Sequence, residues 1–210
     1  MSTFLDHQNW RYATKKFDAT KKLTTQDLDT LMEAIRLSSS SYGLQPYKIL
    51  IIENPELRSK IQKSAWGQSQ VVDASHLLVF ANQIDISDTQ IDELIENTSK
   101  TRGIEKETLA GYQGFMKSKI NELTGDAKNI WKSKQTYLAL ANLLNAAAEL
   151  KIDVTPMEGF SPADVNEILG LNELGLNASL LAPVGFRHAE DPTQHYKKVR
   201  KSKEELFITI

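Results

Sequence analysis

Apolar residues recur at helical spacing soon after the start of the chain. Thr24, with Asp27 three residues later, has the pattern of a helix N-cap. The side chains at i, i+3, i+4 and i+7 then share one apolar face and predict a helix over residues 25–37: Leu28, Leu31, Met32 and Ile35. This helix leads into a serine run at 38–41, where side-chain hydroxyls compete with helical hydrogen bonding.

Short runs rich in β-branched and other apolar residues predict strands. We expect strands at 47–53, 76–82 and 178–186, and a short β-type arm at 206–210. Further helices are predicted at 55–65, 88–98, 104–123 and 126–150, and between the Ser161 cap and Gly170. Helix 126–150 is apolar on nearly all sides, which is typical of a core or a subunit interface. Strands and helices mix without a regular βαβ rhythm, so the predicted fold class is α+β.

Composition narrows the possible functions. The chain has 210 residues, 40% of them hydrophobic and 25% charged, and no linker or repeat divides it, so we expect one domain over 1–210. With 25 basic and 27 acidic residues the net charge is −2, which argues against a dedicated nucleic-acid binder. The sequence contains no apolar run of about 20 residues and no signal-peptide pattern at its start. We therefore expect no membrane partner and a cytoplasmic protein.

The absence of cysteine excludes several kinds of chemistry. Without Cys there is no thiolate nucleophile, iron–sulfur cluster or Cys-ligated zinc, so any redox chemistry would need a bound cofactor. The four histidines lack metal-ligand spacing, so we expect no metal site. Dinucleotide-binding, phosphate-loop and nucleophile-elbow motifs are also missing. Residues 73–76 (DASH) contain the letters of a catalytic triad, but we expect adjacent residues to point apart and interpret them as a helix end or a turn entering a strand.

Three features of the sequence could carry chemistry. The first is a pair of basic clusters, one with Arg11, Lys15 and Lys16 and one at 197–203. These clusters could bind phosphate or be solvated surface. The second is the serine run, which could donate hydrogen bonds to a polar ligand or merely end the helix. The third is the loop 156–160, whose glycine allows close backbone approach to a ligand, although it could be a plain loop.

These segments, taken in order, resemble the nitroreductase family of FMN-containing NAD(P)H oxidoreductases. The matches span nearly the whole chain. In chain order they are RYATKKFD at 11–18, SSSYGLQPY at 39–47, DASH at 73–76, PMEGF at 156–160, PVG at 183–185 and KVR at 198–200. The resemblance implies an α+β fold with a mixed, mainly antiparallel sheet flanked by helices. It also implies an intertwined homodimer with FMN in the interface.

The resemblance also implies roles for individual residues. Arg11, Lys198 and Arg200 would hold the FMN phosphate, and Lys15 would approach the N1/O2 edge of the flavin. The serine loop, residues 39–43, would come from the partner subunit, and the Gly159 N–H would face flavin N5. The expected cofactor-binding residues are Arg11, Tyr12, Ala13, Lys15, Ser39, Ser40, Ser41, Gly43, Gln68, Gln70, Pro156, Met157, Glu158, Gly159, Lys198 and Arg200. No side chain is expected to act as an acid or base, because the cofactor carries the chemistry.

Some positions depart from the family pattern. Ala13 stands where the family has serine, so one hydroxyl contact is absent. In the short segment 66–71 we expect Gln70 to contact the flavin pyrimidine, with Gln68 as the alternative. A substrate lid would lie within 100–130, where Phe115 is a candidate for contact with the substrate.

Three functions fit the sequence. The first is an FMN-dependent oxidoreductase that takes hydride from NAD(P)H and passes it to nitroaromatics, quinones or flavins, with ping-pong kinetics. The second is a flavin-binding protein of the same fold without significant turnover. The third is a helical interaction domain without a cofactor, which the two basic clusters and the Gly159 loop argue against. No Rossmann fingerprint reports on the choice between NADH and NADPH.

Overall fold

A four-stranded antiparallel sheet forms the centre of the protein, as shown by a computed structural model that describes residues 3–210. The strands are β1 (Tyr47–Ile52), β2 (His76–Gln83), β3 (Asp153–Val154) and β4 (Leu176–Gly185), in the order β1-β2-β4-β3. All three strand pairings are antiparallel. The predicted α+β class and mainly antiparallel sheet are therefore confirmed.

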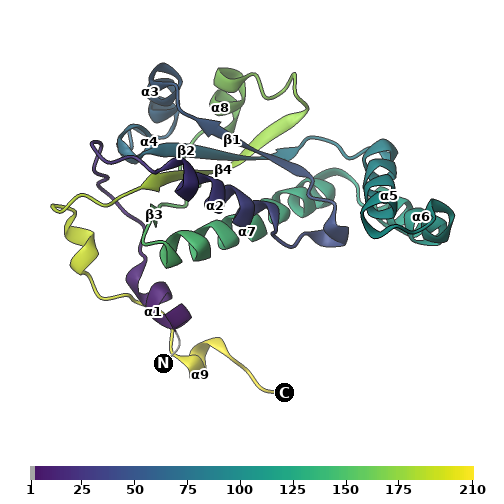
Figure 1. Cartoon of the computed structure of the whole chain (residues 1–210). Coiled ribbons are helices and arrows are strands. Elements are labelled where there is room, and N and C mark those ends of the chain that lie inside the picture. Colours follow the sequence, from purple (N-terminus) through teal and green to yellow (C-terminus); the bar gives the residue numbers. More distant parts are fainter. Residues whose placement is uncertain (1–2) are drawn as a thin grey trace.

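Both faces of the sheet are covered, and for this reason strand β2 reads as a nearly continuous apolar run. Alternate side chains of β2 face opposite layers. Leu78 and Phe80 pack into one buried cluster with residues of α2 (Thr25–Arg36) and α7 (Gly125–Glu149). Leu77 and Val79 pack into a second cluster with residues of the helices on the opposite face, which are α3 (Pro55–Ser64), α4 (Gln70–Asp73) and α8 (Pro162–Leu169). Figure 1 shows these two helical layers above and below the sheet.

A smaller unit extends from one end of the sheet (Figure 1). It consists of α5 (Asp88–Arg102), η2 (Lys106–Leu109) and α6 (Ala110–Glu122). Its own buried cluster includes Ile91 and Met116, and Tyr42 and Leu44 of the loop after α2 pack against it. A short helix, η1 (Ser41–Gly43), forms within that loop. The serine run is thus attached to the α5/α6 unit.

Local signals located most of the helix ends correctly. The capping box of Thr24 and Asp27 is present at the start of α2. The Ser161 side chain caps α8, and Gly170 ends that helix in the left-handed conformation at φ 62°. The helix predicted over 88–98 continues to Arg102, because Gly103 is the first residue with a left-handed backbone that can end it.

The two chain ends differ from the sequence prediction. Helix α1 (Thr3–Trp10) was not predicted, since its apolar residues form no clear stripe. The segment after β4 contains η3 (Pro192–His195) and α9 (Lys203–Leu206). The β-type arm predicted at 206–210 is wrong for the single chain, because Leu206 ends α9 and the last four residues join no strand. A strand needs a neighbour for its hydrogen bonds, and none lies beside this segment in one chain.

None of the helices within residues 3–210 combines the length and the apolar character that a membrane crossing requires.

Candidate functional site

Three cations from opposite ends of the chain meet beside α1. The Lys198 ammonium donates a hydrogen bond to the backbone oxygen of Arg11, 187 residues away. Burial lowers the pKa of Arg11, and the charge of Arg200 lowers it further. The pKa of Lys198 is likewise lowered by burial and by the charges of Arg11 and Arg200. Within residues 3–210 none of the three pairs with a carboxylate. This cation cluster is therefore suited to an anion.

A buried carboxylate links the two chain segments that carry these cations. Asp191 is fully buried, and its Oδ2 accepts hydrogen bonds from the Tyr12 hydroxyl at 2.9 Å and from the Lys15 and Lys16 amides at 2.8 and 3.1 Å. Its Oδ1 accepts from the amide and hydroxyl of Thr193. Burial alone would raise the pKa of Asp191, but these hydrogen bonds outweigh it and lower the pKa to about 2.

A second buried acid, Asp153, also contacts the segment that contains Lys15. Asp153, at the start of β3, forms a bidentate pair with Arg187, with Nη2 to Oδ1 at 2.7 Å and Nε to Oδ2 at 3.1 Å. The Arg187 guanidinium lies over the rings of Trp10 and Tyr12, at 4.1 and 4.5 Å from their centroids. The Thr14 hydroxyl donates to Asp153 at 3.2 Å. Asp191 and the Asp153–Arg187 pair therefore both fix residues 10–16, while the side chain of Lys15 stays exposed.

The loop 156–160 is attached to the sheet and flanked by polar and aromatic groups. Met157 exchanges two backbone hydrogen bonds with Leu181 of β4, at 2.8 and 3.0 Å. The Gln68 amide donates to the Gly159 carbonyl at 2.9 Å. The Tyr137 hydroxyl of α7 donates to Glu158 Oε1 at 2.7 Å, and burial together with this bond raises the pKa of Tyr137 to about 12. Pro156 and Glu158 are exposed on this loop.

The two glutamines proposed for the flavin pyrimidine lie in different surroundings. Gln68 is half-buried and contacts the Gly159 loop, whereas Gln70 is buried at the start of α4. Gln68 is thus the one that the structure brings next to Glu158 and Gly159.

The serine loop lies away from the cation cluster and packs against Phe115 of α6. The Ser41 amide donates to Gln135 Oε1 of α7 at 2.7 Å, and the Gln45 amide donates to Ser40 Oγ at 3.0 Å. The rings of Tyr42 and Phe115 are 6.5 Å apart, edge to face. Ser39 and Gly43 are exposed. Figure 1 shows the α5/α6 unit, to which this loop is attached, on the opposite side of the molecule from α1 and α9. A single chain therefore does not bring the serine loop to the cation cluster.

Sequence reasoning missed Asp191, Asp153, Arg187, Tyr137 and Trp66, which surround the expected site residues. Only one of them had a recognisable local signal. Asp191 precedes Pro192 and Thr193 as a helix cap does, and its side chain accepts from the Thr193 amide. That signal predicts a helix start and says nothing of Lys15, 176 residues earlier.

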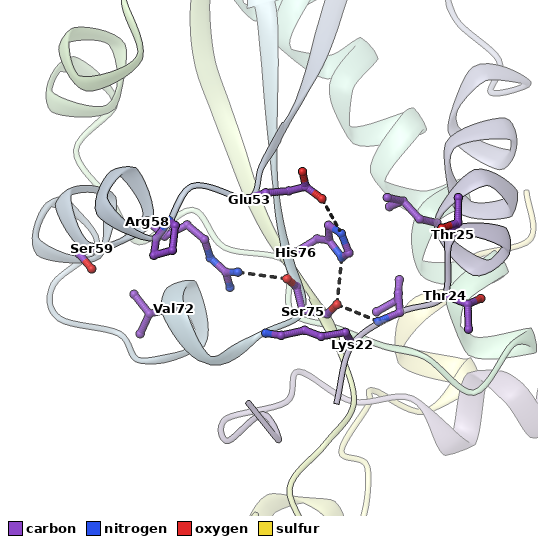
Figure 2. A pocket seen from close by; sticks show the side chains of 12 residues that line it. Lys22, Thr24, Thr25, Glu53, Arg58, Ser59, Val72, Ser75 and His76 are labelled. Carbon is purple, nitrogen blue, oxygen red and sulfur yellow. Dashed lines mark hydrogen bonds and ion pairs between the residues drawn. The ribbon is translucent and has the colours of Figure 1, made fainter. Parts of the chain in front are cut away.

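Ser75 and His76, the last two residues of the segment 73–76, line a separate cavity of about 660 Å³ between α2 and α3. As expected, α4 ends at Asp73 and β2 begins at His76. The expectation that adjacent residues point apart is wrong, because Ser75 Oγ lies 3.0 Å from His76 Nδ1 and His76 Nε2 lies 3.3 Å from Glu53 (Figure 2). Ser75 lies in the bend before the strand, where the alternation of the pleat does not yet apply.

This Ser75–His76–Glu53 chain has a structural use. The Leu23 amide donates to Ser75 Oγ at 2.8 Å, which holds the segment before α2 onto the sheet. Ser75 is buried, and its oxygen already accepts that backbone bond, so it is poorly placed to be a nucleophile. Burial lowers the pKa of His76, against the opposing charge of Glu53.

The fold is α+β, built on an antiparallel sheet, and its cation cluster beside α1 is suited to an anionic group; comparison with known proteins gives the family. A model of the nitroreductase family matches residues 9–186, and the chain belongs to the nitroreductase family. The matched part ends before Lys198 and Arg200. The family resemblance inferred from the motifs is confirmed.

Similar proteins agree with this assignment. YfkO of Bacillus subtilis, whose name places it provisionally among the NAD(P)H nitroreductases, is 36% identical over 199 residues, covering 90% of each chain. SERP2086 of Staphylococcus epidermidis, named in the same way, is 35% identical over 221 residues, covering 99% of this chain and 97% of its own.

Two solved structures share the fold. The nitroreductase-like protein YdfN of Bacillus subtilis has a TM-score of 0.89 at 20% identity, with 99% of each chain covered. A protein from Exiguobacterium sibiricum, described as a nitroreductase in complex with FMN, has a TM-score of 0.84 at 17% identity, with 100% of this chain and 98% of its own covered.

Proposed function

We propose that the protein is an FMN-dependent NAD(P)H oxidoreductase that reduces nitroaromatics, quinones or flavins. The observation that carries the proposal is the cluster of Arg11, Lys198 and Arg200, in which burial and the neighbouring charges lower the pKa of Arg11 and Lys198, and which has no carboxylate partner within the described residues. Like charges repel, so such a cluster needs an anion, and a phosphate dianion suits two guanidinium groups. The family, the names of the relatives and the FMN complex of one structural neighbour support FMN as the source of that phosphate.

The residues near Gly159 suit the ring system of the same cofactor. The Gly159 carbonyl is engaged by Gln68, and its amide is not among the backbone donors paired within residues 3–210, so it is available to flavin N5. Exposed Lys15 provides a positive charge for the N1/O2 edge. FMN, when bound, transfers hydride through N5 between a nicotinamide donor and an acceptor. The chain itself binds the phosphate, orients the ring and shapes the acceptor pocket.

The phosphate proposal is tested by comparing FMN with riboflavin, which lacks the phosphate. Arg11→Ala should weaken FMN binding by about 2–4 kcal/mol, because the phosphate loses a charge-assisted partner. Riboflavin binding should change little. Arg102→Ala, which removes an exposed arginine at the end of α5, is the matched control and should leave both affinities unchanged. Equal affinity of the unaltered protein for FMN and riboflavin would contradict the proposal.

Turnover is tested separately. The colour of the purified protein and its bleaching by NADH or NADPH distinguish an oxidoreductase from a flavin-binding protein without turnover. Because donor and acceptor would use the same pocket in turn, initial-rate plots should be parallel. Intersecting plots with a demonstrable ternary complex would contradict this mechanism.

We also propose that the complete site requires a homodimer. The α5/α6 unit, against which Tyr42 of the serine loop packs, lies far from α1 and α9 (Figure 1), and the ring of Phe115 contacts that of Tyr42. The end of the chain exposes a run of apolar side chains with no role in a monomer: Leu206, Phe207, Ile208 and Ile210. Leu138 of α7 is also 46% exposed, and β1 is an edge strand that could accept another chain. An obligate interface above about 2,000 Å² is expected.

Deleting residues 206–210 tests the dimer. The deletion should loosen the dimer and lower FMN occupancy together, since a ligand that binds only the dimer stabilises it by mass action. Sedimentation and flavin absorbance of the same sample measure both quantities. A monomer with a full complement of FMN would show that the site is built within one chain, and the roles of Ser39, Ser40 and Ser41 would then be withdrawn.

A further inference from the structure

The turn after α3 holds a tryptophan in an unfavourable backbone conformation. Helix α3 ends with its C-cap at Ala65, and the Gly67 amide bonds back to the Gln62 carbonyl at 2.9 Å. This arrangement places Trp66 at the residue after the cap, with φ 56°, where helices usually have glycine. A bulky residue with positive φ is a genuine outlier and is retained only where something else requires it. The next residue, at φ 73°, is Gly67, so the same turn has glycine at one left-handed position and tryptophan at the other.

The Trp66 side chain adds little to the folded core. It is 77% exposed, and it belongs to none of the three buried clusters of the described residues. The other two tryptophans are engaged differently, since Trp10 stacks on Arg187 and Trp131 packs against the α5/α6 unit. The stability of the fold therefore explains neither the strained backbone of Trp66 nor the exposure of its indole.

What the indole does contact is Gly159. A Cβ added to Gly159 would lie 2.7 Å from Trp66 Cζ3 and 3.2 Å from Cε3, so the absence of a side chain there admits the ring. Gln68, from the same turn, fixes the Gly159 carbonyl at 2.9 Å. The turn 66–68 and the loop 156–160 are thus one unit, in which an exposed aromatic face lies directly beside the residue assigned to the cofactor.

We propose that Trp66 is a specificity-determining residue, which forms a wall on which a planar aromatic acceptor stacks next to Gly159. The inference rests on the proposed FMN site at that glycine and goes further, because it names the surface that selects the acceptor. Flat aromatic rings gain from stacking on an indole beyond the area they bury, whereas compact or aliphatic acceptors do not. Planar quinones and nitroaromatics would depend on Trp66, and a small inorganic acceptor such as ferricyanide would not.

The backbone conformation provides a variant that removes the indole without harming the fold. Trp66→Gly accepts φ 56° freely, so its melting temperature should equal or exceed that of the unaltered protein. Trp66→Asn, another residue that tolerates positive φ, serves as a second small variant. Trp66→Phe keeps a flat ring and should rescue binding. Leu174→Ala removes a large apolar side chain that is 64% exposed in the turn before β4, away from the proposed site, and is the matched control.

Binding is measured without turnover, with the FMN-loaded protein and 2-naphthoate, a planar aromatic that the flavin does not reduce. The shift in the flavin spectrum gives the affinity, and cyclohexanecarboxylate is the non-aromatic control. Trp66→Gly and Trp66→Asn should bind naphthoate about tenfold more weakly or worse, while Trp66→Phe stays within about threefold. In turnover, KM for 1,4-naphthoquinone should rise by a similar factor, with the rate on ferricyanide unchanged.

The outcomes separate the two proposals. An unaltered protein that binds no FMN refutes the proposed function and this inference with it. Normal FMN affinity in all variants, together with unchanged naphthoate affinity in Trp66→Gly, overturns the inference alone. A melting temperature of Trp66→Gly well below that of the unaltered protein would show that the indole is structural, and would also overturn it.

Discussion

Replacing Asp191 by asparagine should destabilise the protein by about 2–4 kcal/mol at pH 7. The buried carboxylate accepts five hydrogen bonds, from the Tyr12 hydroxyl, the Lys15 and Lys16 amides, and the amide and hydroxyl of Thr193. Asparagine keeps the size but turns one accepting oxygen into an amino group that faces other donors. Hydrogen bonds to a charged group contribute about 1.5–3 kcal/mol, and a buried donor left without a partner costs about 1–3 kcal/mol.

The lowered pKa of Asp191 expresses the same hydrogen bonds as a dependence of stability on pH. Folding lowers it from the ordinary value of 3.8 to about 2, which corresponds to about 2.5 kcal/mol of stability at neutral pH. Because the folded pKa is the lower of the two, this stability is present above about pH 5 and is lost as the pH falls towards 2. About half of it should remain at pH 3.

Urea unfolding of the unaltered protein and Asp191→Asn, at pH 7 and at pH 3–4, measures both quantities. The stability difference should shrink at the lower pH, and Asp126→Asn, an exposed acid at the start of α7, should show neither effect. A difference below about 0.5 kcal/mol at pH 7, or one that does not depend on pH, would refute the reasoning. Because Asp191 holds the segment of Lys15, and Lys15 in the proposed site faces the ring edge that FMN and riboflavin share, the substitution should also weaken the binding of both flavins.

Three smaller predictions follow from other contacts. Gly185→Ala should destabilise by about 1–3 kcal/mol in urea, since its Cβ would lie 2.9 Å from a backbone nitrogen, whereas Gly159→Ala meets only exposed or flexible side chains and should cost less. Ser75→Ala should cost about 1–3 kcal/mol by leaving the buried Leu23 amide without an acceptor, and full stability would contradict this. Tyr137→Phe should remove from the ultraviolet titration one tyrosine that ionises near pH 12, and an unchanged titration would show that Tyr137 does not bond Glu158.

Secondary structure could be predicted from the sequence because its signals are local. The apolar stripe of Leu28, Leu31 and Ile35 defines a helix wherever it lies, and the Ser161 cap and Gly170 mark helix ends through bonds within a few residues. The prediction failed at 206–210, where apolar residues favour a strand but no neighbouring strand exists in one chain.

The candidate site was only partly predictable, because its supporting contacts are long-range. The sequence by itself determined the family, the sheet and the candidate residues Arg11, Lys198 and Gly159, since these lie in recognisable motifs. Only the tertiary structure decided that Lys198 reaches Arg11, that Asp191 holds the Lys15 segment, and that Trp66 lies on Gly159. No local signal encodes such meetings, because the paths of the loops and the packing of the layers, and not the spacing along the chain, bring these groups together.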